Sequence, residues 1–162
     1  MTVDIDRSNK YPKTYKDIVF VLFQLIILVL FFILPVWWRF YVNDFVFISG
    51  CIIAAAGPLI IIWASINLGR SISPFPTPNE KGVLITSGIF KFIRHPIYSG
   101  FLLLLIGVTI STGSLSRVVI TLLSMIFYSI KASYEEQRLM KKYPGYFQYK
   151  EQTGKFIPKI VK

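Results

Sequence analysis

Two short polar clusters stand at the ends of apolar segments, and their residue types could perform chemistry together. Residues 94–100 read R-H-P-I-Y-S-G and enter one apolar segment, and residues 135–139 read E-E-Q-R-L and leave the next. A helix that begins at Pro96 presents unpaired N–H groups and the positive end of its dipole, which can hold a carboxylate or phosphate. Glutamates facing it can accept hydrogen bonds from ligand hydroxyl or ammonium groups. The clusters therefore predict a binding site for a polar ligand.

The residues alone leave simpler interpretations open. His95 is the only histidine, and a single histidine at a helix start is more often a structural hydrogen-bonding group. Glu135 and Glu136 precede several basic residues and could form a solvated helix face, while Arg94 could anchor a lipid headgroup. A metal site is not expected, because His95 and the only cysteine, Cys51, lie far apart in the chain.

Four apolar segments must position the clusters. They are residues 18–38, 45–68, 96–115 and 115–134. About 20 helical residues cross the roughly 30 Å apolar core of a bilayer. The break S-T-G-S at residues 111–114 is typical of a turn, so the last two segments are predicted to form a helical hairpin rather than one long helix. The predicted fold class is all-α: a polytopic integral membrane protein with four transmembrane helices.

This pattern divides the chain into three parts. They are an N-terminal segment, residues 1–17, a first transmembrane helix pair, residues 18–68, and a core, residues 69–162. The core opens with a polar loop, residues 69–95, which is unusually long for a compact protein and therefore suggests a function. Residues 1–64 indicate topology but no chemistry, with Gln24 the only strongly polar residue of the first apolar segment.

The tail, residues 135–162, is predicted to begin as a continuation of the fourth helix. It is rich in aromatic residues, which fit a segment at the membrane–water interface. These residues are Tyr143, Tyr146, Phe147, Tyr149 and Phe156. We therefore expect a C-terminal interfacial helix.

The distribution of charge predicts the orientation. The formal net charge is +10, yet charged residues make up only 16% of the chain, against about 25% in soluble proteins. Of the 18 Lys and Arg, all but Arg39 and Arg117 fall in the N-terminal segment, the polar loop or the hairpin's final turns and tail. By the positive-inside rule these parts, including both termini, are cytoplasmic. The basic residues flank apolar segments, so the expected partners are membrane lipids and not nucleic acid.

The ordered set of motifs resembles the isoprenylcysteine carboxyl methyltransferase family. That family shares an R-H-P-x-Y, hydrophobic stretch, E-E signature with phospholipid N-methyltransferases. The resemblance covers roughly residues 65–158, from L-G-R at 68–70 through L-I-T-S-G-I-F at 84–90 and the two clusters to F-I-P at 156–158. It implies that residues 69–162 are a methyltransferase-like core of an integral-membrane enzyme. The implied enzyme uses S-adenosylmethionine at the cytoplasmic face and methylates a lipophilic small molecule or lipidated acceptor, at a carboxylate or an amine.

The resemblance also implies roles for individual residues. The cofactor-binding positions are Gly82, Val83, Leu84, Ile85, Phe90, His95, Pro96, Ile97, Tyr98 and Glu135. A basic residue four positions before the first motif glutamate, here Lys131, is implicated in handling a substrate carboxylate. We hypothesise that Lys131 or Arg94 orients an anionic acceptor and that Glu136 acts as a base if the acceptor is an amine.

Two positions depart from the family's pattern. Phe90 stands where tyrosine is frequent, which removes a hydroxyl. Lys131 stands where the eukaryotic carboxyl methyltransferases have arginine, so a point charge replaces a bidentate fork.

Two other functions remain open at this point. The membrane-embedded end of the sterol reductases has a similar histidine-proline motif and a similar ending, and Lys81, Lys91 and Arg94 could serve the extra phosphate of NADPH. A non-catalytic membrane scaffold that binds anionic lipid is the third reading. S-adenosylhomocysteine and NADPH binding would distinguish the three.

Overall fold

The computed structural model describes residues 14–78 and 82–159. The order of the elements in these residues is α1 (Tyr15–Ile33), α2 (Asp44–Leu68), η1 (Gly69–Ser71), η2 (Gly88–Lys91), α3 (Pro96–Thr112), α4 (Leu115–Lys142) and α5 (Tyr146–Gln152). The described part of the chain is thus helical, with two isolated β-bridges. Residues 1–13 of the predicted N-terminal segment, and Lys81, lie outside the described residues.

Three helices, α1, α2 and α4, are long and apolar enough to cross a membrane, while α3 is a shorter apolar helix. The break between α3 and α4 confirms the predicted hairpin. Gly113 follows α3 in the left-handed conformation, with φ +55°, and Leu115 begins α4. A left-handed residue ends an α-helix, and glycine adopts it without steric cost. The helix α4 then continues to Lys142, as predicted for the start of the tail.

The first helix is shorter than the predicted apolar segment 18–38. It ends at Ile33 because Leu34 adopts an extended conformation, φ −60° and ψ 137°, before Pro35, and a residue preceding proline disfavours the helical region. The backbone of Trp38 then accepts a hydrogen bond from the N–H of Leu115 at 3.2 Å. The α1–α2 connection is therefore held against the turn between α3 and α4.

The helices α2 and α3 pack with their backbones in contact. Gly50 and Gly57 lie one heptad apart on α2 and face Gly107 and Gly100 on α3. A Cβ atom at Gly50 would lie 2.8 Å from the carbonyl oxygen of Gly107, and one at Gly57 would lie 2.5 Å from that of Gly100. Small residues permit such close approach between apolar helices.

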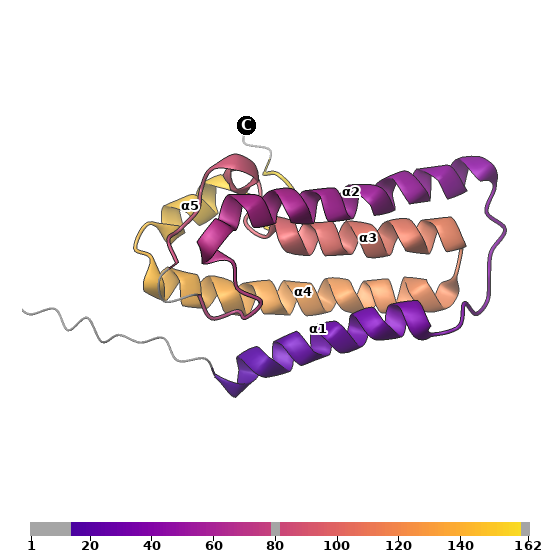
Figure 1. Ribbon diagram of the computed structural model, residues 1–162, viewed down its shortest axis with the longest axis horizontal. Coiled ribbons are helices and arrows are strands. Elements are labelled where there is room, and N and C mark those ends of the chain that lie inside the picture. Colours follow the sequence, from indigo (N-terminus) through magenta and orange to yellow (C-terminus); the bar gives the residue numbers. More distant parts are fainter. Residues whose placement is uncertain (1–13, 79–81, 160–162) are drawn as a thin grey trace, which may run out of the picture.

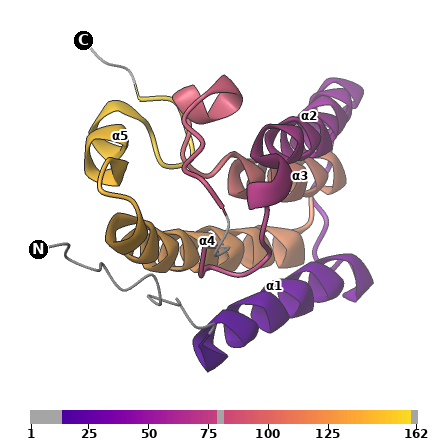
Figure 2. The same cartoon turned by 60° about the vertical axis from the view of Figure 1, so that its left-hand side comes forward.

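The helices α1 to α4 run along one axis, α1 beside α4 and α2 beside α3 (Figure 1). The starts of α1 and α3 and the ends of α2 and α4 gather at one end of the molecule, together with α5 (Figure 1). Figure 2 brings this end forward and shows the segment before α3 passing between α5 and the α2–α3 pair. The two polar clusters consequently meet at the same end, as the hairpin predicts.

Candidate active site

A cavity of about 500 Å³ lies at the end of the bundle where the two clusters meet. Its volume falls within the usual range for sites that bind small molecules. Walls come from α1, α2, the polar loop, α3, α4 and α5. Every predicted site residue except Glu136 lines it, namely Gly82, Val83, Leu84, Ile85, Phe90, Arg94, His95, Pro96, Ile97, Tyr98, Lys131 and Glu135.

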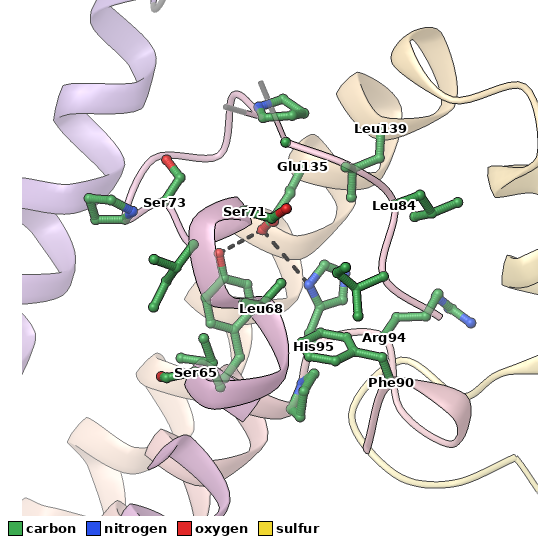
Figure 3. Close-up of a pocket in the computed structure, with 18 of the residues that line it drawn as sticks. Ser65, Leu68, Ser71, Ser73, Leu84, Phe90, Arg94, His95, Glu135 and Leu139 are labelled. Carbon is green, nitrogen blue, oxygen red and sulfur yellow. Dashed lines mark hydrogen bonds and ion pairs between the residues drawn. The ribbon is translucent and has the colours of Figure 1, made fainter. Parts of the chain in front are cut away.

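Glu135 is held at the cavity by two residues of the first cluster. Its Oε2 accepts a hydrogen bond from the Tyr98 hydroxyl at 2.7 Å and lies 3.8 Å from Nδ1 of His95 (Figure 3). The rings of His95 and Tyr98 stack with centroids 5.3 Å apart and an interplanar angle of 4°. The Glu135 side chain is 25% exposed, so it can accept hydrogen bonds from a ligand in the cavity. Helix α3 begins at Pro96, as predicted, and this start places His95 and Tyr98 one turn apart.

Arg94 and Glu136 form a buried ion pair beside the cavity. Nε of Arg94 lies 2.9 Å from Oε1 of Glu136, whose Oε2 lies 2.9 Å from Nζ of Lys150. The Arg94 guanidinium also donates to the carbonyl oxygens of Lys150 and Thr153. The side chains of Arg94 and Glu136 are only 8% and 5% exposed. In Figure 3, Arg94 points away from Glu135. This geometry favours a role in docking the tail over the hypothesised roles of Arg94 in orienting an acceptor and Glu136 as a base.

Tyrosines of the tail hold the polar loop against the cavity. The Tyr143 hydroxyl donates to the carbonyl oxygen of Gly82, and the Tyr149 hydroxyl donates to that of Phe90, each at 2.7 Å. Burial raises the pKa of Tyr149 to about 12, so its hydroxyl remains a neutral donor. The assignment of the tail aromatics to the membrane interface is therefore wrong for Tyr149, and also for Tyr146, which is 1% exposed. Loop carbonyls and the protein interior cover them instead.

Lys131 lies on the side of the cavity next to α1 and contacts Gln24, which was not among the predicted site residues. It is 2% exposed, and its Nζ donates to Oε1 of Gln24 on α1. The ammonium also lies 5.1 Å from the centroid of the Tyr98 ring. Gln24 lines the cavity, so residues 1–64 contribute a polar side chain to the candidate site in addition to the topology read from the sequence. A single strongly polar residue within an apolar transmembrane segment is itself a signal of a functional site.

A second contact of α1 secures the loop. Asp17 is fully buried, and its Oδ2 accepts hydrogen bonds from the Thr77 hydroxyl at 2.8 Å and from the backbone N–H of Thr14 at 2.6 Å. Thr77 belongs to the proline-rich part of the polar loop. The start of α1 and this loop are therefore joined on the side of the cavity next to Gln24.

The amino-acid sequence of the chain is similar to those of known methyltransferases. Residues 45–145 match the model of a family described as phospholipid methyltransferase. A probable protein-S-isoprenylcysteine O-methyltransferase of Oryza sativa subsp. indica is 32% identical over 99 residues, covering 58% of this chain and 52% of that protein. Protein-S-isoprenylcysteine O-methyltransferase A of Arabidopsis thaliana is 29% identical over 126 residues, covering 75% and 60%. The Schizosaccharomyces pombe protein of that name is 30% identical over 101 residues, covering 60% and 43%. The chain thus spans about half the length of the curated relatives it matches.

Proposed function

The chain belongs to the phospholipid methyltransferase family, and from that premise we propose that it is an integral-membrane methyltransferase that uses S-adenosylmethionine. Its acceptor is a lipophilic or amphiphilic molecule, as in the isoprenylcysteine O-methyltransferases it resembles. The observation that carries this proposal is the shared cavity. It is lined by the ten positions assigned to the cofactor and by Lys131 of the acceptor side.

The lining of the cavity fits the cofactor. S-adenosylmethionine has an ammonium group and ribose hydroxyls. The partly exposed carboxylate of Glu135 can accept hydrogen bonds from these groups. Phe90 offers an aromatic surface to the adenine, and Leu84 and Ile85 offer apolar surface. When bound, the cofactor supplies a methyl group that its sulfonium already activates. The protein's own task is then to position the two molecules and to exclude water.

The ion pairs that Glu136 forms favour a carboxylate acceptor over an amine acceptor. An ammonium acceptor must lose a proton before it can react, and Glu136 was the candidate to remove it. Both oxygens of Glu136 are held in ion pairs, and the residue does not line the cavity. A carboxylate acceptor is already deprotonated at neutral pH and needs no base.

The reductase alternative finds less support. Of the three basic residues considered for the extra phosphate of NADPH, the structure describes Arg94 and Lys91, and neither offers an unengaged cation to the cavity. Arg94 lines it, but its guanidinium is engaged by Glu136 and the tail. Lys91 is exposed and does not line the cavity, and Lys81 lies outside the described residues.

We further propose that α3 is a fourth transmembrane helix and that both termini are cytoplasmic. The helix has 17 residues, about 26 Å at 1.5 Å per residue, and packs along α2. Large apolar side chains on the outer face of α2, such as Leu59 and Ile66, are 67% and 72% exposed and suit contact with lipid. The exposed Phe147 of α5 suits the cytoplasmic interface.

Calorimetric titration of the full chain in detergent with S-adenosylhomocysteine tests the function, with NADPH as the paired ligand. We expect S-adenosylhomocysteine to bind and Glu135→Gln to weaken its binding at least about tenfold, because a charged acceptor is lost. Glu151→Gln, an exposed glutamate of α5, is the matched control and should not change the affinity. Binding of NADPH alone would indicate a reductase, and binding of neither ligand by a folded sample would reject the enzyme.

A further inference from the structure

Lys131 is a buried cation that forms no ion pair in the described residues, and Glu135, one turn further along α4, attracts it only from beyond ion-pair distance. The ammonium group of Lys131 contacts the neutral amide of Gln24 and the ring of Tyr98. The ion pairs in residues 14–78 and 82–159 join Arg94, His95 and Lys150 to Glu135 and Glu136, and none includes Lys131. A buried charge is unfavourable unless an opposite charge compensates it. Because Lys131 lines the cavity, an anion bound there would supply that charge.

The chemistry of the contact determines how Gln24 is oriented. A lysine ammonium donates hydrogen bonds and cannot accept them, so the oxygen of the Gln24 amide must face Lys131. The amide nitrogen, with its two N–H donors, is bonded to the same carbon as that oxygen, on a residue that also lines the cavity. This side of the cavity therefore carries a cation from α4 and a neutral N–H donor from α1.

Packing of α1 against α4 holds Gln24 in position. Phe20 and Phe23 contact the ring of Phe127 on α4, with centroids 6.0 and 5.1 Å apart. The face of α1 that carries Gln24 also carries its buried residues, Asp17, Ile27 and Phe31. Gln24 is thus a polar residue inside an ordered helix–helix contact, which pre-organises its amide.

We propose that Gln24 is a specificity-determining residue of the acceptor site, which fixes the Lys131 ammonium and donates its own amide N–H to the second oxygen of a carboxylate acceptor. Two donors side by side match the two oxygens of a carboxylate better than a single ammonium does. Ile61 and Phe101 line the cavity from α2 and α3 and offer apolar surface to the lipid part of the same acceptor. The inference rests on the proposed methyltransferase function.

The test measures equilibrium binding of N-acetyl-S-farnesylcysteine, a carboxylate probe, to the full chain saturated with S-adenosylhomocysteine. The uncharged carboxamide of the same probe is measured in parallel. We expect Gln24→Leu to weaken binding of the acid about tenfold and that of the carboxamide less than twofold, because the lost donor serves the carboxylate. Kinetically, the loss should appear in KM for the acid more than in kcat. Affinity for S-adenosylhomocysteine should stay within twofold of wild type.

A rescue variant separates recognition from structure. An arginine carries two N–H donors in one planar fork, so Lys131→Arg in the Gln24→Leu background should restore most of the affinity for the acid. Gln24→Met, which keeps the length and volume of glutamine, replaces Gln24→Leu if the leucine variant unfolds. Gln137→Leu, an exposed glutamine of α4, is the matched control and should behave as wild type.

The outcomes divide cleanly. Equal losses for the acid and the carboxamide, or a failed rescue, would show a merely structural role and overturn the proposal. Competition by phosphatidylethanolamine that depends on Gln24, without binding of the acid, would assign the pair to a phosphodiester and also overturn it. If wild type fails to bind S-adenosylhomocysteine, the proposed function fails first, and this result is read separately from the Gln24 comparison.

Discussion

The α1-side wall of the cavity, formed by Gln24 and Lys131, and the tail-side wall, formed by Arg94 and backed by its partner Glu136 and by Lys150, each hold a buried cation. On the tail-side wall, Arg94 is compensated by a carboxylate and by backbone carbonyls. On the α1-side wall, Lys131 contacts a neutral amide and an aromatic ring and forms no ion pair in the described residues, and the carboxylate of Glu135 acts on it only at longer range. The comparison teaches that burial alone does not identify a ligand-binding charge. A charge whose partners are complete holds the protein together, whereas one without a counter-charge at a cavity is available to a ligand.

The largest expected effect comes from breaking the tail-side wall. Glu136→Ala leaves Arg94 buried without its carboxylate and should lower the free energy of unfolding by about 3–5 kcal/mol. Thermal unfolding followed by circular dichroism in detergent measures the loss. Glu151→Ala, at an exposed glutamate of α5, should have little effect. A stability equal to wild type would mean that the ion pair does not dock the tail, and the two walls would no longer differ.

The α1-side wall should respond in the opposite sense. Lys131→Met removes a buried charge that lacks a carboxylate partner, so the free energy of unfolding should stay equal or rise. The same variant should weaken binding of a carboxylate acceptor about 10- to 100-fold, since a charged hydrogen bond is lost. Unfolding and acceptor binding are measured on one preparation. A large loss of stability would show that Lys131 is structural, like Arg94.

The smallest effect should come from the contact between the tail and the polar loop. Tyr149→Phe removes the donor to the carbonyl of Phe90 and leaves a buried acceptor without its partner, at a cost of about 1–2 kcal/mol. Hydrogen exchange of the loop amides should rise before global unfolding changes, because the contact is local. Unchanged exchange in the loop would mean that the tail does not hold the polar loop in place at the cavity.

Much of the fold was predictable because its signals are local. The turn S-T-G-S at residues 111–114 separates α3 from α4, and Pro96 starts α3. The hairpin then brings residues 94–98 next to Glu135, as expected from the order of the motifs. The end of α1 was predicted too late, since apolar composition continues past Pro35 while the backbone does not.

Long-range partners were not predictable in the same way. Gln24 and Lys131 lie 107 positions apart, and no local pattern relates a glutamine of the first helix to a lysine of the fourth. The tail tyrosines looked like membrane-interface residues because their rings are amphipathic. Only the folded chain supplies the loop carbonyls that accept the hydrogen bonds of Tyr143 and Tyr149.

Glu135 and Glu136 show which features the sequence determines and which depend on tertiary packing. The amino-acid sequence by itself determined that a carboxylate pair leaves an apolar helix opposite an Arg-His-Pro entry, because composition and helix length are local properties. Successive residues of an α-helix point about 100° apart. Tertiary packing therefore decided that Glu135 meets the cavity while Glu136 is enclosed by Arg94 and Lys150, since only the neighbours of α4 give its faces different surroundings.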